Sequence, residues 1–142
     1  MPRIQLTPRE SYQFTVALTI RVTDLNYGGH LANDRVLALL HEARVAHLAS
    51  CGWTEMDCGG VSLIMTDVAI VFRNEGFAGD ELTCASTMAE PSRCGFRIFY
   101  LLTRRSDDAQ IAVAESSLAC FDYQARRVVA LPDLVRAACA TD

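Results

Sequence analysis

Two hydrophobic periods meet within the first fifty residues of this 142-residue chain. Between positions 14 and 22, apolar residues occupy every second position and mostly polar residues fall between them, which is the period of a half-buried strand. From about position 34, apolar residues recur at helical spacing, form a wide arc and stop at Gly52. A strand that leads into one long helix with a wide apolar face indicates a domain that mixes α and β structure.

The rest of the chain is predicted to consist mainly of strands separated by turns. The segments with alternating polarity are 62–73, 82–90, 94–104 and 111–121, and the turns between them are 77–81, 91–93 and 106–108. Pro132 begins a short amphipathic helix near the C-terminus. The predicted order is one strand, one long helix, four meandering strands and a tail helix.

One helix cannot cover a five-stranded antiparallel sheet, so we expect the sheet to curl around it. The predicted fold class is α+β: a curled antiparallel sheet of about five strands around one long central helix, followed by a short C-terminal helix. We expect residues 1–142 to form a single domain, because this length suffices for one core. An exposed edge or face of the sheet should pair with a second copy, which predicts a homodimer or homotetramer.

Composition excludes several classes of function. A net charge of -4 without a block of Lys and Arg argues against binding nucleic acid. The apolar stretches are too short to span a bilayer and the first residues lack the apolar core of a signal peptide, so a cytoplasmic protein without membrane attachment is expected. The six cysteines form no C-x-x-C pair and lie mostly in apolar patterns, which predicts reduced core residues rather than a metal site or disulfides.

The polar turn between the first strand and the helix is the place where chemistry is expected. Asp24 and Asn26 continue the phase of the apolar strand residues, so a regular strand would carry a carboxylate and an amide toward the interior. An unpaired buried charge is costly, so this placement requires a reason.

The second half of the turn predicts a cradle for a carbonyl group or an anion. Gly28 and Gly29 permit positive φ angles and close backbone approach. Asn33 or Asp34 is a suitable N-cap for the helix, whose first N–H groups are unpaired and carry partial positive charge.

The turn and helix resemble those of a known family. The residues that carry this resemblance are Asp24-x-Asn26-x-x-Gly29-His30, then Asn33, then His41-Glu42-Ala43-Arg44. They are similar to hotdog-fold acyl-CoA thioesterases of the 4-hydroxybenzoyl-CoA thioesterase type, and segments 77–82, 117–123 and 131–132 extend the similarity over nearly the whole chain. The resemblance implies hydrolysis of an acyl-CoA thioester at the interface of a dimer or tetramer. It implies no metal or redox cofactor, with coenzyme A entering only as part of the substrate.

One position departs from the family, because Asn26 stands where the family has its catalytic carboxylate. An amide can neither accept a proton from water nor attack as a nucleophile, so Asn26 could only orient water or hold the thioester oxygen. Asp24 and Glu42 are the remaining candidates for the general base. Asp24 could instead be a structural acid that caps backbone N–H groups of the turn. Another branch of hotdog enzymes places a catalytic Glu on this helix, but Glu42 could also be an ion-pair partner of a neighbouring Arg.

The other candidate residues would bind or polarise the substrate. His30 could donate to the thioester oxygen or help to activate water, or it could only fix the loop. The resemblance places the backbone N–H of Asn33 at the helix start as an oxyanion-hole donor, with Gly29 beside it. His41 and His47 are expected to be packed, hydrogen-bonded core residues.

Ser92 and Arg93 match the turn where the family contacts the phosphates of coenzyme A, and an Arg side chain is suited to bidentate phosphate binding. Their alternative interpretation is an ordinary solvated turn.

Two other functions remain open. A hotdog enoyl-CoA hydratase is suggested by Asp24-x-Asn26 followed by His30, although the His lies one residue too far along. A non-catalytic dimer that binds acyl-CoA or an acyl carrier is suggested by the missing acid at position 26.

Overall fold

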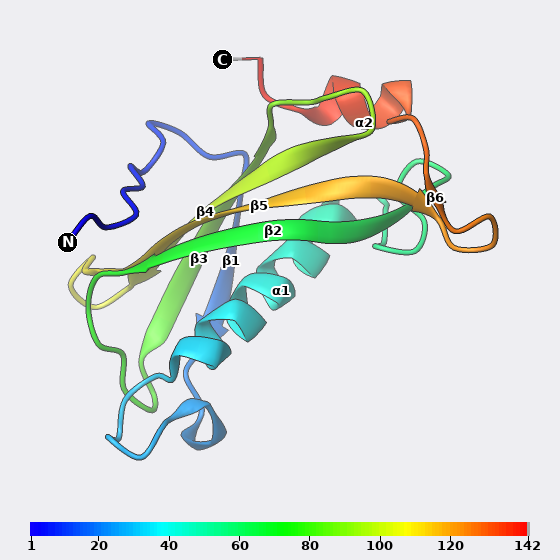
Figure 1. Cartoon of the computed structure of the whole chain (residues 1–142). Helices are drawn as coiled ribbons and strands as arrows, with labels where there is room; N and C mark the ends of the chain where they lie inside the picture. Colours follow the sequence, from blue (N-terminus) through cyan, green and yellow to red (C-terminus); the bar gives the residue numbers. More distant parts are fainter. Residues whose placement is uncertain (142) are drawn as a thin grey trace.

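The computed structural model describes residues 1–141. The chain forms one antiparallel sheet, one long helix and a short C-terminal helix (Figure 1). The elements are β1 (Phe14–Thr19), the 3-10 turn η1 (Val22–Asp24), α1 (Asn33–Ser50), β2 (Ser62–Phe72), β3 (Glu81–Ala89), β4 (Gly95–Arg104), β5 (Gln110–Asp122), β6 (Arg127–Val128) and α2 (Asp133–Ala138).

The strands lie in the order β1-β3-β4-β5-β2, and the two-residue β6 pairs with β5. The sheet curls around α1, and α2 lies at the end of the molecule opposite the turn that precedes α1 (Figure 1). The predicted α+β class is therefore confirmed, with β6 as a sixth strand. The predicted four-strand meander is wrong, because β2 pairs with β5 rather than with β3. The segment 73–80 thus crosses from one edge strand to the interior of the sheet.

The core lies between α1 and the concave face of the sheet. Alternate residues of β4 point into it, and the helix contributes its apolar arc. These buried residues include Phe96, Ile98, Tyr100 and Leu102 from β4 and Val36, Leu40, Ala43 and Leu48 from α1. The two periods seen in the sequence therefore face each other across one interior.

Two histidines of α1 have different environments. His47 is buried, its Nδ1 lies 2.8 Å from Ser86 Oγ, and its ring stacks on Phe14, which confirms the prediction of a packed core residue. The same prediction is wrong for His41, which is exposed and pairs through Nε2 with Glu55 Oε1 at 2.7 Å. His41 lies at the edge of the apolar arc, where the helix surface meets solvent.

The predicted boundaries around the turn are also corrected. The first strand ends at Thr19 rather than Val22, because the chain bends into η1 and leaves Val22 exposed. The N-cap of α1 is Ala32 rather than Asn33 or Asp34, and no side chain caps the helix. Ala32 is held extended because its N–H donates to the carbonyl oxygen of Asp24 at 2.9 Å.

All six cysteines are free thiols, and Cys58, Cys84, Cys120 and Cys139 are buried, as the core interpretation predicts. Cys94 is half-buried and Cys51 is exposed at the C-terminal end of α1. No helix within residues 1–141 has both the length and the apolar character needed to cross a bilayer.

Candidate functional site

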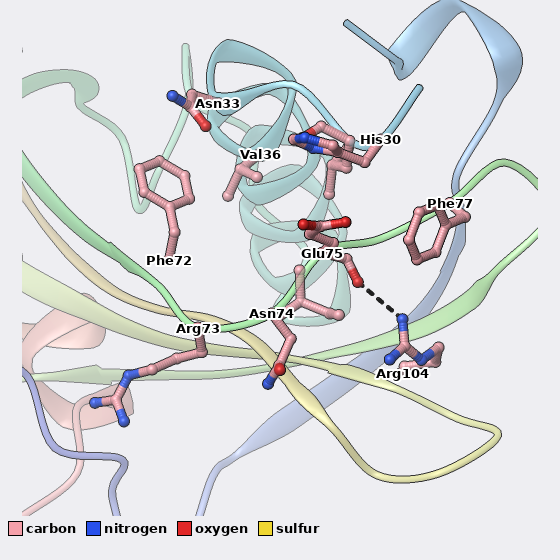
Figure 2. A pocket seen from close by; sticks show the side chains of 11 residues that line it. His30, Asn33, Val36, Phe72, Arg73, Asn74, Glu75, Phe77 and Arg104 are labelled. Carbon is pink, nitrogen blue, oxygen red and sulfur yellow. Dashed lines mark hydrogen bonds between the residues drawn. The ribbon is translucent and has the colours of Figure 1, made fainter. Parts of the chain in front are cut away.

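A pocket of about 540 Å³ opens beside the N-terminal end of α1 (Figure 2). Three parts of the chain form its wall: the turn and first turn of α1, the end of β2 with the loop that follows it, and the facing ends of β4 and β5. The lining residues are His30, Leu31, Asn33 and Val36, then Phe72, Arg73, Asn74, Glu75 and Phe77, and then Arg104 and Ile111. Of the residues predicted for the site, His30 and Asn33 therefore meet in one pocket.

The turn that carries His30 is closed by its own backbone. Asn26 N–H donates to the carbonyl oxygen of His30 at 2.9 Å, and Gly29, at φ +81, donates to the carbonyl oxygen of Asn26 at 3.0 Å. The side-chain oxygen of Asn26 accepts from Gly28 N–H at 2.9 Å. Asn26 therefore forms a local turn contact next to the pocket instead of lining it.

The absence of a side chain at Gly28 leaves room for the side chains of Asn26 and His30. A Cβ atom added at Gly28 would lie 3.3 Å from Asn26 Oδ1 and 3.3 Å from His30 Nε2. A side chain at position 28 would therefore crowd both Asn26 and His30, and the imidazole also makes a long Nδ1 contact of 3.4 Å to the carbonyl oxygen of Leu31.

Asp24 is buried beneath the turn, and its carboxylate is fully engaged by Arg21. Oδ2 accepts from Arg21 N–H at 2.9 Å and Nε at 3.3 Å, and Oδ1 accepts from Nη2 at 3.2 Å. Burial acts to raise the pKa of Asp24, but these hydrogen bonds from Arg21 outweigh it and the pKa is lowered. Asp24 does not line the pocket. Its position is the one that a structural acid of the turn would occupy.

The start of α1, beside the pocket, has unpaired backbone donors. The carbonyl oxygen of Ala32 accepts from the N–H groups of Arg35 and Val36. Within residues 1–141, the N–H groups of Asn33 and Asp34 have no hydrogen-bond acceptor. Asn33 belongs to the pocket wall, so its free N–H and the positive end of the helix dipole are available to a bound carbonyl oxygen.

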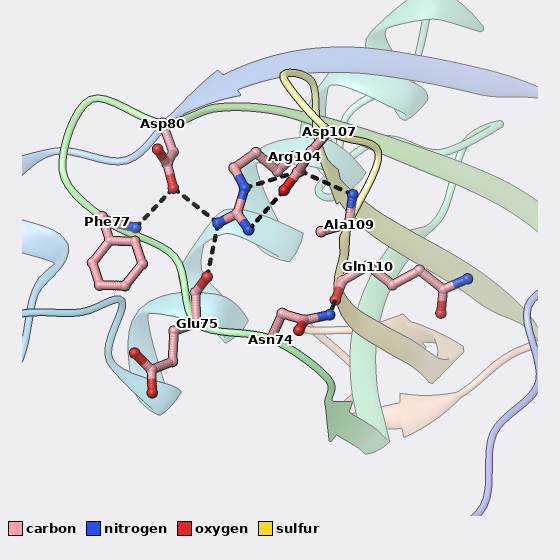
Figure 3. A network of polar contacts seen from close by, with 8 residues as sticks. All are labelled: Asn74, Glu75, Phe77, Asp80, Arg104, Asp107, Ala109 and Gln110. Carbon is pink, nitrogen blue, oxygen red and sulfur yellow. Dashed lines mark hydrogen bonds and ion pairs between the residues drawn. The ribbon is translucent and has the colours of Figure 1, made fainter.

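The loop after β2 contributes residues that the sequence did not indicate. Arg104, at the end of β4, donates through Nη1 to the backbone carbonyl oxygen of Glu75 at 2.9 Å and to Asp80 Oδ2 at 3.2 Å (Figure 3). Its Nε and Nη2 bind the two oxygens of Asp107. Arg104 thereby ties the loop to the sheet. The residues around Glu75 show no strand or helix periodicity that would indicate a functional site. Only the adjacent Gly76 is unusual, and a glycine in a loop generally indicates no more than a turn.

A comparison with families of known proteins identifies the chain at this point. The model of the thioesterase-like superfamily matches residues 20–139, a span that includes the turn, α1 and the whole pocket wall. The chain belongs to the thioesterase-like superfamily. No match was found among curated protein sequences.

Solved structures support the fold of this superfamily member. A 1,4-dihydroxy-2-naphthoyl-CoA thioesterase from Synechocystis is 22% identical, with a TM-score of 0.80 over 88% of this chain and 93% of the other. YbaW, described as a probable thioesterase from Escherichia coli, is 22% identical, with a TM-score of 0.76 over 89% and 96%. A thioesterase superfamily protein from Jannaschia is 16% identical, with a TM-score of 0.83 over 94% and 84%. These similarities confirm the hotdog fold that the sequence resembled.

Besides Asp24, Asn26 and Gly29, three more of the predicted residues do not line the pocket of this thioesterase-like chain. Glu42 is exposed on α1 and makes no hydrogen bond or ion pair with any described residue, so its predicted Arg partner is not found. Ser92 and Arg93 lie in the turn between β3 and β4, and their carbonyl oxygens accept from Arg136 Nη2 and Leu131 N–H, both at 2.9 Å. That turn is beside α2, at the other end of the molecule (Figure 1).

Chemically, the pocket combines a free backbone donor, an imidazole and a carboxylate. The donors are the N–H of Asn33 and the ring of His30, and the carboxylate is that of Glu75. In residues 1–141, no three His, Cys, Asp or Glu side chains are grouped so that they could hold a metal ion. The arrangement is suited to polarising a carbonyl group and to accepting a proton near it.

Proposed function

We propose that this thioesterase-like protein hydrolyses an acyl-CoA thioester to a free acid and coenzyme A in the pocket at the start of α1. The observation that carries this proposal is the unpaired N–H of Asn33, a residue that lines the pocket together with His30. A thioester carbonyl bound there becomes more electrophilic, because the N–H and the helix dipole stabilise negative charge on its oxygen. Water adds to the carbonyl carbon, the C–S bond breaks, and coenzyme A leaves as a thiolate.

The roles of the predicted residues follow from their contacts. Asn33 would hold the thioester through its N–H, and His30, which also lines the pocket, would donate a hydrogen bond to the thioester oxygen. Gly29 does not line the pocket and donates to the carbonyl oxygen of Asn26, so its part is to shape the turn. Asn26 serves to shape the turn. Asp24 is a poor candidate for the general base, because Arg21 occupies both of its oxygens and the pKa is lowered.

We also propose that the active form is a homodimer built on the edge strand β2. Within residues 1–141, one side of β2 has no partner strand, and the strand exposes the side chains of Ile64, Met65, Val68 and Phe72. A second copy at this edge would cover an apolar surface that a monomer leaves in water. Phe72 belongs to both this edge and the pocket wall, so the partner would lie next to the bound acyl group. Ser92 and Arg93 would then be available to the phosphates of coenzyme A only if they reach it across subunits.

A binding protein without turnover is the second candidate, because Asn26 lacks a basic oxygen and the carboxylate of Asp24 faces Arg21. The Asn26→Asp variant distinguishes the two. It should add activity to a module that lacks only an acid at this position. In an enzyme where Asn26 only shapes the turn it should change activity little, because an Asp oxygen can accept the same hydrogen bond from Gly28 N–H. No contact in the pocket favours the hydratase.

The experiment is the release of free thiol from short, medium, long and aromatic acyl-CoA substrates. Thiol reagents also label the exposed Cys51, so the Cys51→Ser variant should be used throughout. Turnover that depends on the acyl group supports the proposal. No turnover across the panel, together with binding of acyl-CoA, would replace it with the binding function.

A further inference from the structure

We propose that Glu75 is the general base of this site and takes the proton from the attacking water. The inference rests on the proposed hydrolysis and supplies the carboxylate that the turn lacks at position 26.

The carboxylate of Glu75 lies in the pocket and is free to act. Figure 2 shows it turned toward the side of the pocket that carries His30, while the backbone carbonyl oxygen of the same residue faces Arg104. Figure 3 shows from another direction that the carboxylate of Glu75 points away from Arg104, while its backbone carbonyl oxygen points toward it. Within residues 1–141, neither carboxylate oxygen has a hydrogen bond or an ion pair. Both oxygens can therefore accept from water.

The loop holds Glu75 from both sides. On one side, Asn74 Nδ2 donates to the carbonyl oxygen of Gln110 at 2.7 Å. On the other, the carbonyl oxygen of Gly76 accepts from Leu31 N–H at 2.7 Å, which joins the loop directly to the turn that carries His30. Gly76 permits this approach because a Cβ atom there would lie 2.5 Å from Ile20 Cδ1. A base held on fixed backbone keeps its position relative to the substrate carbonyl.

The charge of Arg104 does not neutralise Glu75. The guanidinium is paired with Asp80 and Asp107, and it meets Glu75 only at the backbone carbonyl oxygen. Arg104 therefore fixes the backbone of Glu75 without pairing with its carboxylate.

The other acids of the chain do not meet these conditions. Glu75 is the one carboxylate that lines the pocket in the described part of the chain. Both carboxylate oxygens of Asp24 accept hydrogen bonds from Arg21, and Glu42 lies outside the pocket wall. Asn26 cannot accept the proton.

In the reaction, water gives one proton to the Glu75 carboxylate as its oxygen bonds to the thioester carbon. The carbonyl π electrons move to oxygen, where the Asn33 N–H stabilises the charge. When this oxyanion collapses, the C–S bond breaks and the thiolate takes the proton held by Glu75. The products are the acid and the thiol, and Glu75 is again ionised.

Glu75→Gln tests the assignment, because it removes the proton acceptor and keeps the size of the side chain. We expect kcat to fall by about 100-fold or more, the usual contribution of a general base. Binding can be measured with a ketone analogue of acyl-CoA that has a methylene group between sulfur and carbonyl. Its Kd for the variant should stay within about threefold of its Kd for the parent protein, since the carboxylate acts on water and not on the substrate. Glu10→Gln is the matched control, since Glu10 is exposed and lines none of the four pockets described.

The outcomes separate this inference from the proposed function. If the parent protein hydrolyses acyl-CoA and Glu75→Gln retains its kcat, the function stands and Glu75 is not the base. If the parent releases no thiol from any substrate, the function fails and the inference fails with it. A Glu75→Asp variant with activity between those of the parent and Glu75→Gln would support the assignment, because it keeps the carboxylate and shortens its reach.

Discussion

The guanidinium of Arg104 binds the backbone carbonyl oxygen of Glu75 at 2.9 Å, although 28 residues of chain separate them. This bond links the end of β4 to the loop after β2, two segments that are not adjacent in the strand order. The same guanidinium holds Asp80 at the other end of the loop. One side chain thus fixes both ends of the segment that carries the proposed base.

Replacing Arg104 should therefore reduce activity by moving Glu75. For Arg104→Met we expect kcat to fall by about 10- to 100-fold, the scale expected when a reacting group shifts by about 1 Å. The ketone analogue should still bind, which a steady-state and a binding measurement together would detect. A decrease in binding with unchanged kcat would contradict a positioning role. Arg105→Met provides a control at the neighbouring, exposed position.

Gly76→Ala should destabilise the protein, because the new methyl group would meet the buried Ile20 at 2.5 Å. Overpacking of this kind costs about 1–3 kcal/mol in the free energy of unfolding. Ile20→Val removes the opposing Cδ1 atom and by itself should cost about 0.5–1.5 kcal/mol. In urea unfolding, the double variant should be more stable than the sum of the two single effects predicts. Strict additivity would show that the contact is not the cause.

His47 should make the protein less stable in mild acid. Burial lowers its pKa below the ordinary value of 6.5, so the unfolded chain takes up a proton before the folded chain does. The stability that His47 contributes is complete above pH 6.5 and is lost as the pH falls through the lower folded value. Urea unfolding at pH 7.5, 6.0 and 5.0 should show this decrease. His47→Gln should flatten it, and an equal slope in that variant would assign the decrease to other groups.

Asp24 should show the acid counterpart of this behaviour. Its pKa lies below the ordinary value of 3.8, so its contribution to stability is present above that pH and is lost as the pH falls through the lower folded value. Asp24→Asn should be less stable than the parent at pH 7, with a gap that narrows toward pH 3. A gap that is constant with pH would mean that the hydrogen-bond geometry, and not the charge, is responsible.

The dimer proposal predicts a response to charge on the β2 edge. Val68→Lys places a positive charge on the exposed apolar strand and should raise the dimer dissociation constant by at least about tenfold, since edge lysines oppose strand pairing. Sedimentation velocity over a range of concentrations measures this. Leu134→Lys, on the exposed face of α2, is the control. A parent protein that is monomeric at all concentrations would exclude the interface.

The sequence predicted what depends on short-range periodicity. The alternation in β4 and the apolar arc of α1 were enough for the α+β class and for the burial of His47. Periodicity does not say which strands pair, so β2 was expected beside β3 instead of β5. The N-cap was predicted wrongly because Ala32 is held by a backbone hydrogen bond to Asp24. A bond between backbone groups cannot be predicted from the type of side chain at either position.

The sequence predicted only part of the candidate site, because the rest of the site depends on contacts between distant segments. His30 and Asn33 are close in sequence and belong to a recognisable turn. Glu75 is held near them by two long-range hydrogen bonds, from Leu31 N–H to the carbonyl oxygen of Gly76 and from Arg104 to the carbonyl oxygen of Glu75 itself. Long-range hydrogen bonds of this kind cannot be read from residue spacing. They are the reason that a carboxylate in an unpatterned loop lies opposite the helix start.

The way in which the loop is fastened bears on how the substrate range could diverge. None of the hydrogen bonds that hold segment 74–80 uses the side chains of Val36 or Phe72, although both shape the pocket. Substitutions at these two positions can therefore enlarge or narrow the space for an acyl chain without disturbing the backbone around Glu75. The acyl-group specificity of such a protein can therefore change, through evolution or engineering, while its proton acceptor stays in place.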